Sequence, residues 1–135
     1  MEVLALERTL TELDHARLRH LLRGQAARGV DTDVMEGVLD AAHVVAAPDV
    51  PPDVITMYSQ VELALPEGRS TLTVCYPEDA EPNAGFVSVL SPVGTGLLGL
   101  CVGARASWRT PLGTVVSADV LAIRFQPEAS GDYTL

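Results

Sequence analysis

The spacing of apolar side chains early in the chain predicts a helix from Thr11 to about Arg23, with Gly24 as its end. Thr11 and Asp14 have the spacing of a helix start signal, in which a side-chain oxygen accepts from a free backbone N–H. We expect Asp14 and the other polar residues mainly on the opposite sides. The apolar side is Leu13, Leu18, Leu21 and Leu22. Residues 1–8 are compatible with a strand or with an extension of this helix.

A second helix is predicted from Asp33 to about Ala46, because apolar residues recur there at helical spacing. Asp33 and Glu36 form its start signal. Its apolar face is Val34, Val38, Ala42 and Val45. Two helices of similar length joined by a short linker predict an antiparallel hairpin in residues 1–48.

Pro48, Pro51 and Pro52 form an extended linker, because proline lacks a backbone N–H and restricts the residue before it. We place a domain boundary there and expect a second domain at residues 53–135. Alternating apolar and polar runs bounded by turn residues predict its strands. These are 54–57 leading into 60–65, then 71–76, 86–90, 106–109 and 114–125. One short helix interrupts them, so the predicted fold class is α+β with a mainly antiparallel sheet.

The interrupting helix, expected from Thr95 to Leu100, lies within an uncharged run at residues 82–104. The run is long enough to span a bilayer, but its prolines and glycines are typical of a buried core segment. Gly94, Gly96 and Gly99 match the spacing of a dinucleotide-binding loop. Because the helix is short and the next strand returns by a hairpin, we expect no nucleotide and no other cofactor.

The distribution of charged residues along the chain indicates which class of partner it can bind. The chain has 18 acidic residues and nine basic ones, all of them arginine. Residues after 30 carry 14 of the acids and four of the arginines. Such an acidic body argues against contact with a phosphate backbone and favours a protein partner with a basic surface. We expect neither direct sequence-specific nucleic-acid binding nor a membrane anchor.

The metal-binding residue types are scattered. None of the three histidines has a second ligand four residues further on, so we expect no metal site; they are His15, His20 and His43. Cys75 and Cys101 have no CxxC spacing, which favours reduced core thiols in a cytoplasmic protein.

The acids at the hairpin tip, Asp31, Asp33 and Glu36, have two interpretations. They could hold a divalent ion between themselves and a partner's site. Alternatively, Asp33 caps the second helix while Asp31 and Glu36 favour its positive end. Helix capping is the interpretation that this spacing favours.

Four segments resemble the regulator of nucleoside diphosphate kinase (Rnk) family, which in turn resembles the Gre transcript-cleavage factors. The segments are Asp53-Val-Ile-Thr-Met-Tyr-Ser, Leu90-Ser-Pro-Val-Gly-Thr-Gly-Leu-Leu-Gly-Leu, Trp108 with the Thr-Pro-Leu-Gly that follows it, and Gln126-Pro-Glu-Ala-Ser-Gly-Asp-Tyr. The resemblance covers nearly the whole chain from about Thr11. It implies an FKBP-like second domain and a first domain that forms a short antiparallel coiled coil.

The resemblance also implies a partner, bacterial RNA polymerase, bound at the rim of its secondary channel. Gre factors dock on this rim partly through the loop that is Leu90, Ser91 and Pro92 in this chain, so these residues are expected to bind the partner. Leu90 stands where Gre factors usually have Asp or Asn, and Tyr58 replaces an Asn common in the family. Gre factors present coiled-coil acids to the catalytic magnesium, whereas the shorter Rnk hairpin implies occupation of the site without cleavage.

The length of the predicted hairpin agrees with that implication. About 14 residues of helix span about 21 Å at about 1.5 Å per residue, which is short for a deep channel. We therefore expect that Asp31 and Asp33 do not reach the polymerase's magnesium, and that the chain is a non-enzymatic regulator that competes with Gre-type factors. The alternative is a cleavage cofactor that presents its tip acids to magnesium. A third hypothesis, peptidyl-prolyl isomerase activity, rests on the fold alone.

Overall fold

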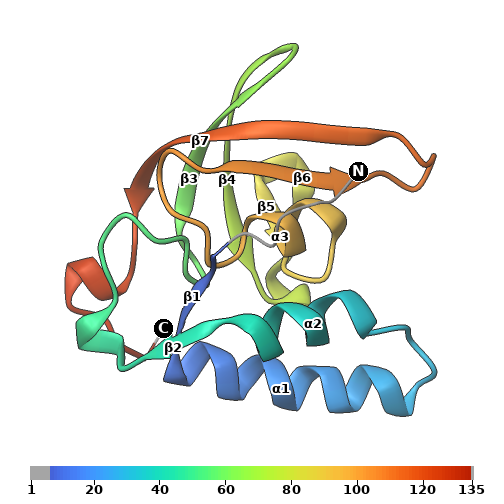
Figure 1. The fold of residues 1–135 in the computed structure, drawn as a ribbon, viewed down its shortest axis with the longest axis vertical. Helices are drawn as coiled ribbons and strands as arrows, with labels where there is room; N and C mark the ends of the chain where they lie inside the picture. The colour runs from blue at the N-terminus through green and yellow to red at the C-terminus, as the bar shows by residue number, and fades with distance from the viewer. Residues whose placement is uncertain (1–6, 135) are drawn as a thin grey trace.

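The computed structural model describes residues 7–134; predictions for residues 1–6 lie outside this range. The chain has the α+β fold predicted from its sequence, with a helical N-terminal part below a curled five-stranded sheet (Figure 1). The strand order in this sheet is β5-β4-β3-β7-β6; within it β4 and β5 pair in parallel, and the other neighbouring strands pair antiparallel. The strands are β3 (Gln60–Leu65), β4 (Gly68–Cys75), β5 (Phe86–Ser88), β6 (Arg105–Arg109) and β7 (Val115–Phe125).

The sheet follows the alternation of the sequence closely. Val61 and Leu63 of β3 are fully buried, while Gln60, the first residue of the strand, is exposed. The two-residue turn Pro66-Glu67 joins β3 to β4, as predicted. The segment 54–57 is not a regular strand, although Val54 forms an isolated bridge with Cys101.

The first helix, α1 (Glu12–Ala27), begins as predicted and ends later. Thr11 is its N-cap, and its side-chain oxygen accepts from Asp14 N at 3.1 Å. The prediction that Gly24 ends the helix is wrong, because the following Gln and two Ala are good helix formers. The chain reverses only at Gly29, whose φ of +81° requires a residue without a Cβ.

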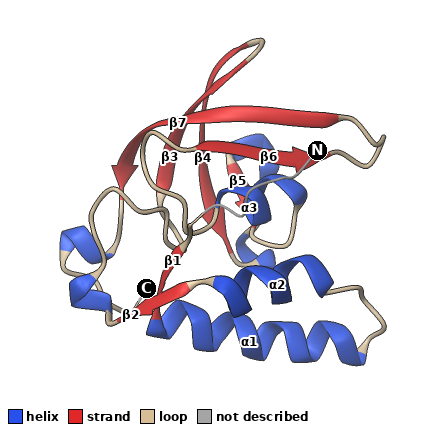
Figure 2. Cartoon of the chain, viewed as in Figure 1, coloured by secondary structure: helices blue, strands red, loops and turns tan. Residues whose placement is uncertain are grey.

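The second helix, α2 (Asp33–Ala41), is shorter than predicted. Residues His43–Val45 form strand β2, which pairs in parallel with β1 (Thr9–Thr11) at the base of the hairpin (Figure 2). The predicted apolar face is correct only in part: Val38 and Ala42 pack against the core, but Val34 is 75% exposed, and Met35 and Leu39 are the buried residues of this helix. The larger Met35 and Leu39 side chains bury more apolar surface one helical turn apart.

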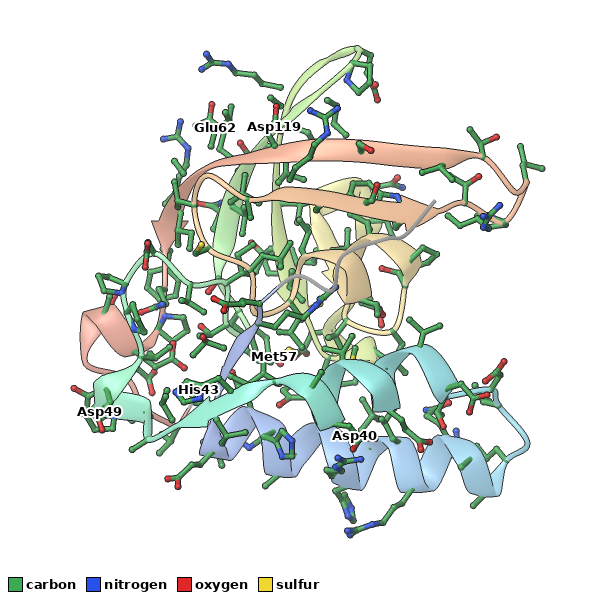
Figure 3. All side chains as sticks on the ribbon, in the orientation of Figure 1. Asp40, His43, Asp49, Met57, Glu62 and Asp119 are labelled. Carbon is green, nitrogen blue, oxygen red and sulfur yellow. The ribbon has the colours of Figure 1, made fainter. Side chains whose placement is uncertain are left out.

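One hydrophobic core joins the hairpin to the sheet. Figure 3 shows Met57, which is 1% exposed, between the sheet and α1. The hairpin contributes its inner face to this core, so it lies against the sheet. The core includes Leu10, Leu18, Leu22, Met35 and Leu39 from the N-terminal part and Ile55, Met57, Val61, Leu63, Val74, Val89, Leu97, Leu98 and Leu100 from the rest.

The short helix α3 (Pro92–Leu97) begins three residues before the predicted Thr95. Proline suits the first helical position, where its missing N–H is not needed. A Cβ on Gly94 would lie 2.1 Å from Ser88 O, and one on Gly96 would lie 3.3 Å from the Trp108 ring. The glycines that match a dinucleotide-binding loop therefore serve the close packing of α3 against its neighbours.

Two further observations bear on the predictions. None of the helices in residues 7–134 is both long enough and apolar enough to cross a membrane. Both cysteines are free thiols; Cys75 is buried, but Cys101 is exposed, so the prediction of two core thiols is wrong for Cys101.

Candidate partner-binding groove

A groove of about 440 Å³ separates the turn of the hairpin from α3 and β6. Its hairpin wall includes Leu22, Val30, Asp31, Val34 and Met35. Its opposite wall includes Arg8, Leu90, Pro92, Trp108 and Arg109. The groove thus has an apolar centre with two arginines and one aspartate around it, a composition typical of protein-binding surfaces.

The corner before α3 presents two of the three residues predicted to bind a partner. Leu90 and Pro92 line the groove. The Ser91 hydroxyl is used within the corner, where it donates to Ser88 O at 2.6 Å and accepts from Gly94 N at 3.1 Å. Ser91 therefore caps α3 and fixes the position of Leu90 and Pro92.

The hairpin tip brings one of its three predicted acids to the same groove. Asp31 lines the groove, and its Oδ1 accepts from Asp33 N at 3.0 Å. The Glu36 carboxylate accepts a hydrogen bond from the Thr32 hydroxyl. Thr32 is the N-cap of α2 and Asp33 its first residue, so the prediction that Asp33 caps the helix is wrong. Within residues 7–134, no three His, Cys, Asp or Glu side chains are grouped to hold a metal ion.

Sequence reasoning did not find the contribution of Arg8 to this groove. Arg8 Nη1 donates to Thr95 O at 2.7 Å and to Leu98 O at 2.9 Å, and so binds the free carbonyl groups at the end of α3. Burial lowers the pKa of the Arg8 guanidinium below its ordinary value. No local sequence pattern indicates this role of Arg8, because Thr95 and Leu98, whose carbonyl groups it binds, lie far along the chain from it. Trp108 is the single tryptophan, and the sequence indicated its importance only as part of the segments that resemble the Rnk family.

A buried carboxyl lies at the other end of the hairpin. Asp14 is 2% exposed, and its Oδ2 accepts from Met57 N at 3.1 Å. The pKa of Asp14 is raised to about 7, mainly by burial; the Met57 hydrogen bond lowers this pKa and the nearby Glu128 charge raises it. The prediction that Asp14 lies on a polar side is wrong, because its carboxyl satisfies a backbone N–H inside the joint between hairpin and sheet.

Tyr58 is the one non-glycine residue of the described chain with a positive φ, at +66°. Such a conformation is uncommon for a residue with a bulky side chain, whereas Asn adopts it more readily. Tyr58 is held there by its N–H, which donates to Val74 O at 2.6 Å, and by its hydroxyl, which donates to Asp79. Burial and the Asp79 carboxylate raise the pKa of Tyr58.

Comparison with known proteins agrees with this architecture. Residues 50–125 match the family described as "Transcription elongation factor, GreA/GreB, C-term". The regulator of nucleoside diphosphate kinase of Escherichia coli strain K12 is 36% identical over 129 residues, which cover 93% of this chain and 95% of that protein. The transcription elongation factor GreA of Solidesulfovibrio magneticus is 39% identical over 61 residues, or 44% of this chain and 37% of that protein.

The fold itself is shared with a solved structure. "Prokaryotic transcription elongation factor GreA/GreB from Nitrosomonas europaea" superimposes with a TM-score of 0.73 at 31% identity, covering 88% of this chain and all of that one. The shared fold and the family match therefore define a protein of the Gre class. Within this class, the chain belongs to the regulator of nucleoside diphosphate kinase (Rnk) family.

Proposed function

We propose that this chain regulates transcription by binding bacterial RNA polymerase at the rim of the secondary channel, where it competes with Gre-type factors without stimulating transcript cleavage. The observation that carries the proposal is the groove, because it combines Leu90 and Pro92 with Asp31 of the hairpin tip. A partner element seated there contacts both parts of the molecule at once. The Gre-like relatives, whose names describe transcription elongation factors, support polymerase as the partner.

The hairpin geometry supports binding without cleavage. The 16 residues of α1 span about 24 Å, and Leu18 and Leu22 hold this helix against the core. Asp31 lines the same groove as Leu90 and is not at the end of an extended arm. A cofactor for cleavage needs acids at the end of a long free arm. An effect on nucleoside diphosphate kinase, which the name of the relative states for that protein, would act through transcription.

A pull-down with core RNA polymerase tests the groove. We expect Leu90→Arg and Pro92→Arg each to weaken binding by about tenfold, since a charge replaces an apolar contact at the centre of the interface. Leu112→Arg is the matched control, because Leu112 is 94% exposed on the turn between β6 and β7 and lies outside the groove. Ser91 is unsuitable for this test because its hydroxyl caps α3. Unchanged binding of both groove variants contradicts the proposed site.

Two functional assays separate the proposal from its alternative. We expect the chain to displace a labelled Gre factor from the polymerase and to leave a stalled elongation complex uncleaved. Stimulated cleavage that disappears on Asp31→Ala combined with Asp33→Ala would instead identify a cleavage cofactor. Failure to displace the Gre factor, with polymerase binding intact, would place the binding site elsewhere on the enzyme.

A further inference from the structure

Exposed aromatic side chains gather on a surface outside the groove. The chain has only two Phe residues, and both are exposed, Phe86 by 38% and Phe125 by 42%. Together with Tyr58 they border a hollow of about 290 Å³, which Gln60 and Thr73 also line. Exposed aromatic residues grouped on a surface mark an interaction site, because aromatic rings are enriched where proteins bind one another.

The register of the sheet places these residues in one row. Phe86 lies beside Thr73, Thr73 beside Gln60, and Gln60 beside Phe125. Since neighbouring strands are about 4.8 Å apart, the row from Phe86 to Phe125 spans about 14 Å. Gln60, Phe86 and Phe125 are exposed and Thr73 is buried, so the row is open to solvent at Gln60 and at the two phenylalanines. An extended chain at about 3.1 Å per residue covers this row with about four or five residues.

Tyr58 connects this hollow to a second one. The second hollow, of about 520 Å³, is lined by Tyr58 and Tyr76, whose ring centroids are 5.8 Å apart, together with Leu21 of α1. Tyr58 has the strained positive φ described above, and strained residues that the surroundings hold in place concentrate at binding sites. Two hollows separated by an aromatic side chain can receive successive side chains of one extended peptide.

The charges around Tyr58 indicate what kind of peptide fits. Asp79 is bound to the Tyr58 hydroxyl, and Glu81 forms an isolated bridge with Phe86. Glu78 lines the second hollow, and all three acids belong to exposed positions of one loop. Arg17 and His20 line the α1 side of the second hollow. Asp79 and Glu81 therefore lie next to Tyr58 and Phe86, at one end of the aromatic row, where they complement a cationic partner and repel a phosphate backbone.

We propose that the surface formed by Tyr58, Phe86 and Phe125 binds an extended, proline-containing segment of a partner protein, with arginine or lysine next to the prolines. Aromatic-lined hollows recognise proline-rich segments, because their preformed extended conformation loses little entropy on binding. The neighbouring carboxylates select the basic residues. This surface is separate from the groove and does not depend on the proposed polymerase interaction.

Titration of the isotope-labelled full chain, followed by NMR, tests the proposal. The probe is a short synthetic peptide of proline, leucine and arginine; the controls are the same peptide with glutamate for arginine and a short oligouridine. We expect saturable shifts around Tyr58, Phe86 and Phe125 with a dissociation constant below about 1 mM, and weaker binding of the glutamate peptide. Absence of saturable binding, shifts centred on Trp108, or tighter binding of oligouridine would each overturn the proposal.

Substitutions show which residues of this surface contribute to peptide binding. Phe86→Ser combined with Phe125→Ser is expected to weaken probe binding by about tenfold, while Leu112→Ser, which changes a more exposed apolar residue elsewhere, leaves it unchanged. Asp79→Lys combined with Glu81→Lys is expected to reverse the preference between the arginine and glutamate peptides. The dispersed NMR spectrum of each variant reports its folding directly. Equal binding by the Phe variant and the wild type would remove the aromatic row from the site.

Discussion

The buried carboxyl of Asp14 makes the stability of this protein depend on pH. Its pKa is about 7 in the folded protein, against an ordinary value of 3.8, and burial is the main cause. An acid whose pKa is raised by folding binds its proton more tightly in the folded state. Its contribution to stability is therefore complete below pH 4 and is lost as the pH rises from about 4 to about 7. This difference corresponds to a loss of about 4 kcal/mol.

The perturbation that isolates this effect is Asp14→Asn. The amide oxygen of Asn can still accept a hydrogen bond from Met57 N, but the Asn side chain does not ionise. Near neutral pH and above, the variant should therefore avoid the cost of a buried charge. Between pH 5.5 and pH 8, we expect the free energy of unfolding of the variant to rise relative to wild type by about 2 kcal/mol.

Urea denaturation, followed by Trp108 fluorescence at several pH values, measures this difference. The sequence pI of 4.6 sets the lower pH limit, because a protein without net charge tends to associate. Asp53→Asn is the control, since Asp53 is exposed, and its difference from wild type should stay constant within about 0.5 kcal/mol. A difference for Asp14→Asn that does not change with pH would refute the reasoning, because the two proteins differ only in this titrating group.

Three further predictions concern stability and accessibility. Gly94→Ala should destabilise the fold by about 3 kcal/mol in urea denaturation, since the added Cβ would lie 2.1 Å from Ser88 O; a loss below about 0.5 kcal/mol would contradict this packing. Ser91→Ala should cost about 1–2 kcal/mol in the same assay through loss of the cap on Gly94 N, with Ser91→Thr as the control that keeps a hydroxyl. A thiol reagent should modify exposed Cys101 quickly and buried Cys75 only after denaturation; rapid reaction of both would show that the Cys75 environment opens.

The sheet was predictable because its signals are local. Alternation at Val61 and Leu63 and the turn at Pro66 each depend on neighbouring residues, and the structure confirms them. The end of the second helix was not predictable in this way. Val44 and Val45 continue a helical spacing as well as a strand, and pairing with Leu10 and Thr11 decides between them. Such pairing is a tertiary effect that a short sequence window does not contain.

The candidate site was likewise predictable only in part. The resemblance to the Rnk and Gre families indicated Leu90 and Pro92 as partner-binding residues, and the charge pattern indicated Asp31. Only the fold shows that these residues line one groove. Asp14 could not be recognised as buried, because the N–H that it binds belongs to Met57, far along the chain. Tyr58 was noticed in the sequence, through the family resemblance, but without a physical reason. The structure supplies that reason, because the backbone of Tyr58 has a positive φ.

The pairing of β1 with β2 constrains how this molecule can change in evolution. The two strands hold both ends of the hairpin in fixed register, from Thr9 beside His43 to Thr11 beside Val45. Residues inserted near this base would disturb the register and the core beneath it. Residues inserted at the turn near Gly29, where a Cβ would meet nothing within 4 Å, would lengthen the arm alone. Arm length can therefore vary independently of the strands at the base and of the core beneath them.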